Sequence, residues 1–441
     1  MNPSIRGRRF FIRTFGCQMN VHDSERLAGS LAAAGARPAG SAEEADIIIV
    51  NTCAVREKPE EKLDSYLGRL APLKRGKDVV IGVAGCVAQL RKDRLLVRKP
   101  FLDFVVGPDN YPEIPSIAAA AAGSRLRRTG RRREWCEGDG TASLRESRSS
   151  GFVTVMEGCD NFCTYCVVPF SRGREKSRPR SSVLREVRAL AGAGYKEVQL
   201  LGQNVNSYRD PETGRGLAGL LEDVCAVPGL SWVRFITSHP RSFGPEIIRA
   251  MASNRKVCRQ LHLPLQSGST DVLGRMNRGY SRTEYLQLVR ALRAALPGLL
   301  LSTDIIVGFP GETERDFADT CRVLEEVRFA NIFSFRYSPR PLTAAGRMAD
   351  DVPRDVKRRR LVELQNLQKG IQLEVNRSFI GRDLTVLCTG AGPKHDGRLS
   401  GRTEGGQVVN FSSPRDLTGE FVTVRILDCG PYSLHGEPAV D

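Results

Sequence analysis

In the first part of the chain, short apolar runs alternate with longer stretches whose apolar positions recur at a helical period. That alternation is typical of a parallel sheet with helices packed on it. The predicted strands lie at 9–15, 46–50, 78–84 and 101–106, and the predicted helices between them include 24–34 and 57–70. The pattern indicates an α/β fold class for this domain.

A second series of strand and helix patterns begins at Gly151. Its predicted strands lie at 152–156, 197–201, 232–237, 260–265, 301–307 and 332–337, and its predicted helices include 182–192, 245–252, 282–296 and 314–327. Successive βα units of this number favour a barrel or partial barrel, whose active site lies at the C-terminal ends of the strands. A long basic helix at 354–377 is expected to close this domain.

The C-terminal part differs, because short strand-like runs at 384–388, 407–411 and 420–427 are separated by glycines and show no helical period. This predicts a small all-β module. An alanine run followed by RLRRTGRRREW at 125–135 looks like an interdomain connection, which could contact nucleic acid or be a solvated linker. The expected domains are 8–124, a basic linker at 125–144, the barrel domain at 145–377 and the all-β module at 378–441.

The length of 441 residues is too great for one hydrophobic core, and 41% hydrophobic and 26% charged residues are ordinary for a soluble globular protein. The basic N-terminus lacks the apolar stretch of a secretory signal. No apolar run approaches the ~20 residues of a membrane-spanning helix. We therefore expect a cytoplasmic protein without a membrane partner.

The charge balance is strongly basic, with 66 Lys and Arg against 50 Asp and Glu, a net charge of +16. Such an excess favours a polyanionic partner, although it could also be a generally basic surface. The 12 cysteines are too sparse for a disulfide scaffold. In a reducing compartment, clustered cysteines are more often metal ligands or catalytic groups.

The strongest chemical signal is the C-x₃-C-x₂-C loop formed by Cys159, Cys163 and Cys166, directly after the first predicted barrel strand. Three thiolates can hold three irons of a cubane cluster and leave the fourth iron open, because the usual fourth cysteine is missing. An open iron can chelate the amino and carboxylate groups of a methionine-derived ligand. The alternatives are a structural zinc site or buried thiols, but zinc normally takes four ligands from two separated pairs.

A second set of cysteines, Cys17, Cys53 and Cys86, shows no local metal-binding spacing. Each falls near the C-terminal end of a predicted strand, however, and those ends open onto one edge of a parallel sheet. Three thiols converging there would form a second cluster site. The alternative is a coincidence of buried, unreactive cysteines, which are common in cores.

Several motifs resemble the radical SAM methylthiotransferase family, and the resemblance covers nearly the whole chain. The N-terminal motifs are TFGCQMN at 14–20, NTCAVRE at 51–57 and the Gly85-Cys86 turn. The central motifs are FVTVMEGCDNFCTYCVVPFSRGREKSRP, LLGQNVNSY, FITSHP, LHLPLQSGS, RMNRGY and FSFRYSPRP. The stretch GRTEGGQVVNF resembles a TRAM domain, a small OB-like RNA-binding barrel. The resemblance implies a partial (β/α)₆ barrel that cleaves S-adenosylmethionine to a 5′-deoxyadenosyl radical.

In such a barrel, polar and glycine residues at the strand ends bind the ribose, carboxylate and adenine of the cofactor. A glycine after a strand can also be an ordinary turn. The candidates for S-adenosylmethionine binding are Gly202, Gln203, Asn204, Gln266, Ser267, Asp304 and Gly308.

QMN after Cys17 and VREK after Cys53 are most similar to the branch of the family that acts on isopentenylated adenosine beside the tRNA anticodon. That resemblance implies transfer of a methylthio group to carbon-2 of the adenine. It implies two 4Fe-4S clusters, with S-adenosylmethionine as radical source and methyl donor. An unactivated aromatic C–H has no acidic proton, so a radical is required. The cluster on Cys17, Cys53 and Cys86 would present the sulfur.

The expected partners are tRNA, an electron donor such as flavodoxin or ferredoxin, and a sulfur or cluster-assembly source; we expect a monomer. Two alternatives stay open: a sibling enzyme acting on threonylcarbamoyl-adenosine or a ribosomal protein, and a non-catalytic, zinc-stabilised RNA-binding protein. The chain departs from the family in one loop. Where the family often has Arg-Pro-Gly-Thr-Pro-Ala, this chain has Leu342 and Ala344 in place of the glycine and second proline, which changes loop stiffness.

Overall fold

The computed structural model describes residues 4–55, 57–121, 125–136, 143–145, 147–392 and 397–439. These residues fold into two compact units. Unit 1 lies within Met1–Glu146, Met156–Asp160 and Cys166–Ser177, and unit 2 lies within Ser147–Val155, Asn161–Tyr165 and Arg178–Asp441. Arg56 of the NTCAVRE motif and the expected domain limit at residue 124 lie outside the described residues.

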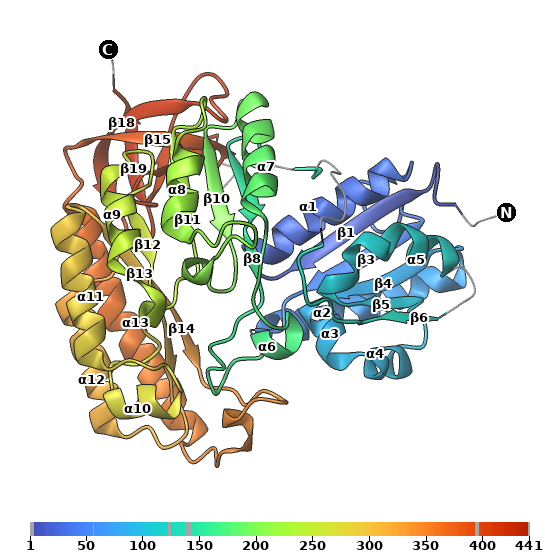
Figure 1. The fold of residues 1–441 in the computed structure, drawn as a ribbon, viewed down its shortest axis with the longest axis horizontal. Helices are drawn as coiled ribbons and strands as arrows, with labels where there is room; N and C mark the ends of the chain where they lie inside the picture. Colours follow the sequence, from blue (N-terminus) through green and yellow to red (C-terminus); the bar gives the residue numbers. More distant parts are fainter. Residues whose placement is uncertain are drawn as a thin grey trace. The chain divides into compact units, whose positions relative to one another are not determined.

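Unit 1 contains a parallel six-stranded sheet (Figure 1). The strands, in sheet order, are β2 (Arg37–Pro38), β1 (Arg9–Phe15), β3 (Ile47–Thr52), β4 (Val80–Gly85), β5 (Phe104–Val106) and β6 (Leu126–Arg128). The predicted parallel sheet is confirmed, with β1, β3, β4 and β5 close to their expected positions. Strand β6 comes from the basic segment that the sequence suggested as a connection, and it pairs in parallel with β5.

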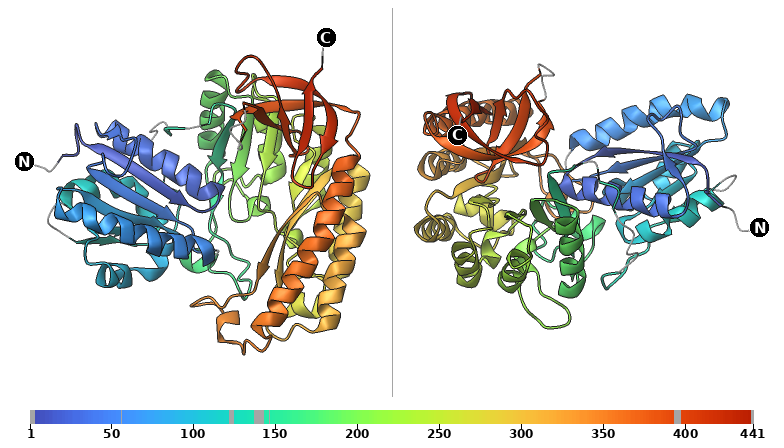
Figure 2. Two further views of the ribbon diagram at one scale, coloured as in Figure 1. Left: turned by 180° about the vertical axis from the view of Figure 1, so that it is seen from behind. Right: turned by 90° about the horizontal axis from the view of Figure 1, so that it is seen from above.

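Helices cover both faces of this sheet, as the view from above shows (Figure 2). Helices α1 (Gln18–Ala33) and α5 (Ile114–Ala120) pack on one face, and α2 (Glu57–Leu70), α3 (Cys86–Arg91) and α4 (Asp93–Arg98) pack on the other. Successive side chains of β3 alternate between the two cores, since Ile47 joins the first and Ile48 the second. Burial on both faces explains the continuous apolar run of β3.

Unit 2 begins with six parallel strands in two sheets, ordered β11-β10-β7 and β12-β13-β14. The strands are β7 (Ser150–Thr154), β10 (Glu197–Leu201), β11 (Trp232–Phe235), β12 (Gln260–His262), β13 (Leu300–Val307) and β14 (Asn331–Arg336). The helices after them are α7 (Arg180–Gly192), α8 (Leu217–Cys225), α9 (Pro245–Ser253), α11 (Arg282–Ala295), α12 (Glu314–Val327) and α13 (Arg354–Arg377). This arrangement confirms the predicted partial (β/α)₆ barrel.

The C-terminal residues form a closed five-stranded barrel, ordered β15-β16-β17-β19-β18. Its strands are β15 (Asp383–Ala391), β16 (Leu399–Thr403), β17 (Val408–Phe411), β18 (Phe421–Cys429) and β19 (Leu434–Pro438). Strands β16 and β19 were not predicted, because each contains a glycine that interrupts the apolar pattern. At Gly436 an added Cβ would lie 2.2 Å from the Arg425 carbonyl oxygen, so the backbones approach too closely for any side chain.

Within unit 2, Arg234 fixes the closed barrel to the central strands. Its guanidinium donates to the carbonyl oxygens of Thr403 (2.8 Å) and Glu404 (2.7 Å) and pairs with the Glu197 carboxylate at 2.6 Å. The ring of Trp232 meets Phe421 edge-on at 4.8 Å. Because Glu197 and Trp232 begin their strands, the closed barrel lies at the N-terminal ends of β10 and β11, opposite the ends where a barrel carries its site. Among the described residues, no helix is both long and apolar enough to cross a membrane.

Candidate functional site

The N-terminal triad (Cys17, Cys53 and Cys86) follows three neighbouring strands of unit 1. Cys17 comes after β1, Cys53 directly after β3, and Cys86 directly after β4. The sheet order reverses between β1 and β3, because β2 lies on the far side of β1. Ligands of open α/β sheets bind at such a switch point, beyond the carboxyl ends of the strands.

The thiols of this triad influence one another. A hydrogen bond with Cys53, partly opposed by burial, lowers the pKa of Cys17 to about 6, and Arg172 contributes to the lowering. The same hydrogen bond raises the pKa of Cys53, as do its burial and the charges of Cys17 and Cys86. Cys17 is thus held toward the thiolate form, which is the form that binds iron.

Glycine is required beside the triad because the backbone is strained and crowded there. Gly85 has φ of 97°, which side-chain-bearing residues rarely adopt. A Cβ at this position would lie 2.5 Å from Asn51 Oδ1 and 2.7 Å from the Thr52 carbonyl oxygen. The Gly85-Cys86 turn therefore lets Cys86 begin helix α3 directly at the end of its strand.

A buried ionic network lies beside the N-terminal triad. Arg172 forms ion pairs with Asp23 and, at 3.6 Å, with Glu157, and all three side chains are buried. Tyr111 Oη lies 3.4 Å from Asp23 Oδ2 and 3.4 Å from Asn51 Oδ1. The sequence analysis assigned no role to these residues. The one indication was that Arg172 lies in the segment 152–179, which resembles the family.

The loop triad (Cys159, Cys163 and Cys166) lies between β8 (Met156–Glu157) and α6 (Val168–Ser171). Cys159 and Cys166 belong to unit 1 and Cys163 to unit 2. In unit 1, the Cys159 amide donates to the Gly173 carbonyl oxygen at 3.2 Å, and the Val168 amide donates to Cys166 Sγ at 3.5 Å. Hydrogen bonds to sulfur are typical of thiolates that hold a cluster.

In unit 2, the segment around Cys163 is held by the residues after helix α10 (Thr270–Arg275). The Thr164 amide donates to the Met276 carbonyl oxygen at 3.0 Å, and Asn277 Nδ2 donates to the Phe162 carbonyl oxygen at 3.2 Å. Arg278 Nη1 lies 3.4 Å from Cys163 Sγ. These residues belong to the RMNRGY motif, which resembles the family, and nothing in its sequence indicates a contact with the cysteine loop.

The candidate residues for S-adenosylmethionine binding lie at or beyond strand ends of unit 2, except Asp304, which is inside β13. Asp304 accepts from His262 Nε2 at 3.3 Å, and the Gln266 amide donates to the Asp304 carbonyl oxygen at 2.8 Å. Ser267 Oγ accepts from the Ser269 amide at 3.2 Å. Gly202, Gln203 and Asn204 follow β10, and Gly308, with φ of 70°, follows β13.

The Gly308 turn involves a carboxylate that sequence reasoning missed. Glu312 Oε1 accepts from the Gly308 amide at 2.8 Å and from Arg360 Nη1 at 2.8 Å. A Cβ at Gly308 would lie 2.3 Å from Lys357 Cγ, so this turn also excludes side chains. Glu312 and Arg360 thus connect the end of β13 to helix α13.

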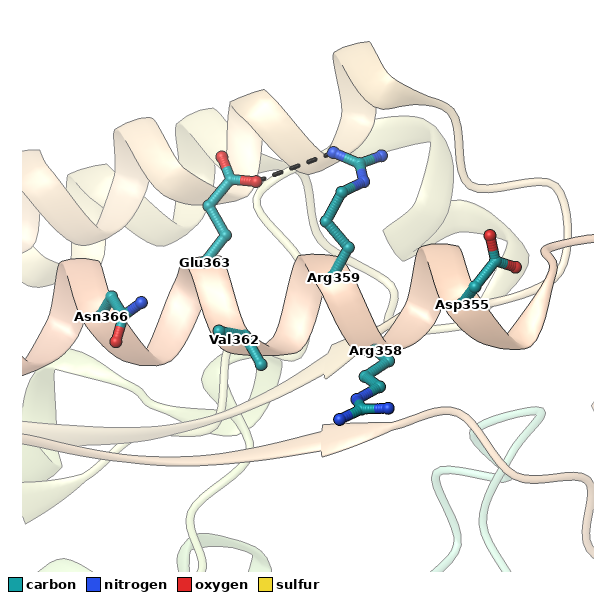
Figure 3. Close-up of a pocket in the computed structure, with 6 residues that line it drawn as sticks. All are labelled: Asp355, Arg358, Arg359, Val362, Glu363 and Asn366. Atoms are coloured by element: carbon teal, nitrogen blue, oxygen red, sulfur yellow. Dashed lines mark ion pairs between the residues drawn. The ribbon is translucent and has the colours of Figure 1, made fainter.

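The described residues contain no group of three or more His, Cys, Asp or Glu side chains arranged to hold a single metal ion. In a cubane cluster, by contrast, each thiolate binds a different iron. A surface hollow lies elsewhere, along the outer face of α13, where Arg359 pairs with Glu363 at 3.8 Å (Figure 3). None of the sequence-predicted site residues lines it; the lining residues are Asp355, Arg358, Arg359, Val362, Glu363 and Asn366.

Three parts of the chain match known families. Residues 9–107 match "Uncharacterized protein family UPF0004", residues 153–324 the radical SAM superfamily, and residues 377–439 the TRAM domain. Two solved structures share the fold. The radical S-adenosylmethionine methyltransferase TsrM from Kitasatospora setae has a TM-score of 0.57 at 15% identity, covering 77% of this chain and 74% of that chain. The cobalamin-dependent radical enzyme OxsB has a TM-score of 0.54 at 13% identity, covering 82% and 56%.

These matches define the class, a radical SAM enzyme with a TRAM domain, and this class implies a 4Fe-4S cluster and S-adenosylmethionine. Curated relatives named tRNA-2-methylthio-N(6)-dimethylallyladenosine synthase give the particular family. The protein of Geobacter metallireducens is 47% identical, covering 98% of both chains, and that of Carboxydothermus hydrogenoformans is 46% identical, covering 97% of this chain and 99% of the other. The chain belongs to this family of MiaB-type methylthiotransferases.

Proposed function

We propose that this enzyme transfers a methylthio group to carbon-2 of an isopentenylated adenosine beside the anticodon of tRNA. The observation that carries the proposal is the presence of two separate three-cysteine sets in one chain. The loop triad has C-x₃-C-x₂-C spacing after the first barrel strand, and the N-terminal triad follows three adjacent strand ends. One set serves radical formation and the other serves sulfur transfer.

The loop triad holds the radical cluster in this proposal. When bound, a 4Fe-4S cluster with an open iron supplies the electron that cleaves S-adenosylmethionine. The chain contributes three thiolates, with the Val168 amide beside Cys166 Sγ and Arg278 beside Cys163 Sγ. An N–H group beside a sulfur suits a thiolate that binds an anionic cluster.

The N-terminal triad holds a second 4Fe-4S cluster, and its role is to present the sulfur that is transferred. The support is the contact between Cys17 and Cys53, the charge of Cys86 acting on Cys53, and the positive charge of Arg172 acting on Cys17. A buried cation that acts on Cys17 and Cys86 offsets part of the negative charge that such a cluster carries.

We propose that residues at or beyond the strand ends of unit 2, together with Asp304 inside β13, orient S-adenosylmethionine. Side-chain and backbone groups beyond the ends of barrel strands are the usual binding groups of this architecture. The assigned residues are Gly202, Gln203, Asn204, Gln266, Ser267, Asp304 and Gly308. The Asp304 carboxylate lies 3.3 Å from His262 Nε2, which is a hydrogen-bonding distance.

The closed C-terminal barrel and the net charge of +16 support a tRNA substrate. A flavodoxin- or ferredoxin-like protein would donate electrons, and a cluster-assembly system would supply sulfur. We further propose a cytoplasmic monomer with domains at 8–124, 145–377 and 378–441. The matched ranges 9–107, 153–324 and 377–439 support these limits, and the expected linker at 125–144 contributes β6 to the N-terminal sheet.

The test uses anaerobically purified full-length protein and two variants. Cys159→Ala should abolish deoxyadenosine formation from S-adenosylmethionine while retaining the iron of the N-terminal triad. The triple variant Cys17→Ala, Cys53→Ala, Cys86→Ala should still form deoxyadenosine but transfer no sulfur to tRNA, as measured by mass spectrometry of the tRNA nucleosides. Colourless zinc protein, or methylthiolation by the triple variant, would overturn the proposal. Methylthiolation of a ribosomal protein or of threonylcarbamoyl-adenosine instead would identify a sibling activity.

A further inference from the structure

Arg278 is a buried cation whose contacts within unit 2 are unusual. The residue is 3% exposed. Its Nη2 donates to the Pro264 carbonyl oxygen at 2.8 Å, its Nε donates to Tyr280 Oη at 3.0 Å, and its Nη1 lies 3.4 Å from both Tyr165 Oη and Cys163 Sγ. Apart from the cysteine, every one of these partners is a neutral oxygen.

Other buried arginines of the chain have carboxylate partners. Arg172 pairs with Asp23, Arg234 with Glu197 at 2.6 Å, and Arg360 with Glu312 at 2.8 Å. In the described part of the chain, no Asp or Glu pairs with Arg278. A buried charge without a counter-charge is unfavourable. Arg278 is such a charge, because none of these carboxylates pairs with it.

Among the groups that contact Arg278, the Cys163 thiol is the one that can bind iron as an anion. It is itself buried, 8% exposed, and one guanidinium nitrogen faces its sulfur. If Cys163 binds iron, its thiolate and the attached cluster supply the missing negative charge. Hydrogen bonds to the sulfurs and nearby charge are among the factors that set the reduction potential of an iron–sulfur cluster.

We propose that Arg278 is a positioning residue that raises the reduction potential of the radical cluster through Cys163. The electron comes from an external reductant, no bond forms or breaks, and the site becomes more negative by one charge. A fixed, buried positive charge favours that more negative state. The inference rests on the proposed function, specifically on Cys163 being an iron ligand.

The test is a redox titration of the full-length chain in the Cys17→Ala, Cys53→Ala, Cys86→Ala background, which leaves one cluster to observe. Dithionite is the reductant, low-potential dyes are the mediators, and electron paramagnetic resonance detects the reduced cluster. We expect Arg278→Gln to lower the equilibrium constant for reduction at least tenfold, which is 59 mV for one electron. Arg278→Lys keeps the charge but loses the planar donor geometry, so its shift should be smaller.

Arg234→Lys is the matched control, because it alters an equally buried arginine whose partners are Glu197, Gln260 and the closed barrel. Its equilibrium constant should stay within threefold of the parent. A cluster-loaded Arg278→Gln protein that also stays within threefold would overturn the inference while leaving the proposed function intact. Failure of the parent itself to assemble this cluster would instead overturn the proposed function.

A second measurement covers the case in which Arg278→Gln does not fold. The otherwise unsubstituted background protein is labelled with nitrogen-15 arginine and reduced, and pulsed electron paramagnetic resonance measures coupling between the cluster and arginine nitrogen. We expect a coupling that disappears in Arg278→Lys and persists in Arg234→Lys. Absence of any arginine coupling in the reduced, cluster-loaded parent would contradict the contact between Arg278 and the cluster ligand.

Discussion

Units 1 and 2 each place a buried arginine beside a candidate cysteine, but they compensate its charge in different ways. Arg172 lies in an ionic network with Asp23 and Glu157, so protein carboxylates neutralise it. Arg278 contacts tyrosine and carbonyl oxygens and the sulfur of Cys163. The charge at the first site is thus balanced by the protein, whereas the balance at the second depends on what Cys163 binds. This second arrangement is the basis for the proposed effect of Arg278 on the reduction potential.

The two regions also differ in how their backbones make tight turns. Beside the N-terminal triad the positive φ belongs to a glycine, Gly85. In the segments that hold Cys163, positive φ angles occur at Phe162 (47°), Asn277 (56°) and Leu342 (72°). Residues with side chains cost about 1–2 kcal/mol in the left-handed region. The loops around Cys163 therefore carry backbone strain that the N-terminal triad avoids.

The largest expected effect tests the charge compensation in unit 1. Asp23→Asn removes a carboxylate that is 0% exposed and pairs with Arg172. Breaking a buried ion pair by removing one partner typically costs about 3–5 kcal/mol, because the other charge remains buried. Native-state hydrogen exchange should show this loss in peptides of helix α1. Tyr111→Phe, which leaves the ion pair in place, is the control and should cost much less.

A double-mutant cycle makes that result specific to the pair. The cycle compares Asp23→Leu, Arg172→Met and their combination, which removes both charges and should be more stable than Asp23→Leu alone. Replacement of a buried ion pair by apolar side chains is often neutral or stabilising. Additive losses would mean that the two residues act independently, and the contrast with Arg278 would then have no basis.

The next effect tests the glycine turn. Gly85→Ala places a Cβ 2.5 Å from Asn51 Oδ1 at a φ of 97°. Backbone strain and overpacking together should cost about 2–4 kcal/mol. Exchange of the β4 amides measures the loss, and Gly68→Ala in helix α2, where an added Cβ meets nothing within 4 Å, is the control. Unchanged β4 exchange would show that the turn tolerates a side chain.

The sequence predicted the strands and helices best where the apolar period was regular. Helix α2 begins and ends at the predicted residues, Glu57–Leu70. Helix α1 begins at Gln18, ahead of the predicted residue 24, because Cys17 and Asn20 form a capping box that the helical period alone does not reveal. The three-residue strand β6 is arginine-rich, so its composition resembled a linker and only its pairing with β5 defines it.

The cysteines could be selected from sequence because their spacing, or their position after apolar runs, is visible along the chain. Their assignment to iron clusters stays a prediction. The charged residues beside them could not be found in this way. Asp23 and Arg172 are 149 positions apart, and Cys163 and Arg278 are 115 apart. Contacts of that separation depend on the fold, and an arginine in a polar stretch gives no sign in the sequence that it will be buried.

A smaller effect tests the neutral contacts of Arg278 in unit 2. Tyr165→Phe removes the hydroxyl that lies 3.4 Å from Arg278 Nη1. Loss of one hydrogen bond to a charged group should cost about 1.5 kcal/mol, well below the cost of Asp23→Asn. Hydrogen exchange of the 161–165 segment in the metal-free protein measures it. A loss as large as that of Asp23→Asn would mean that neutral partners stabilise Arg278 as strongly as carboxylates stabilise Arg172.

The smallest effect concerns the loop in which the chain departs from its family. Leu342 is 61% exposed and has φ of 72°, at the position where the family often has glycine. This loop reaches the cysteine segment, because the Ala345 amide donates to the Thr164 carbonyl oxygen at 2.8 Å. The strained residue Leu342 therefore lies in a loop that is hydrogen-bonded to Thr164, the residue after Cys163.

Leu342→Gly removes a left-handed cost of about 1–2 kcal/mol but gives the unfolded chain more freedom, worth about 0.5–1 kcal/mol. The expected net gain is between 0 and about 1.5 kcal/mol, seen as slower exchange of the amides at Thr164 and Ala345. Leu342→Ala keeps a Cβ and therefore most of the strain, so it should give no comparable gain and serves as the control. If Gly and Ala have equal effects, the backbone at this position is unstrained, and the proposed difference between the turns of the two cysteine regions does not extend to this loop.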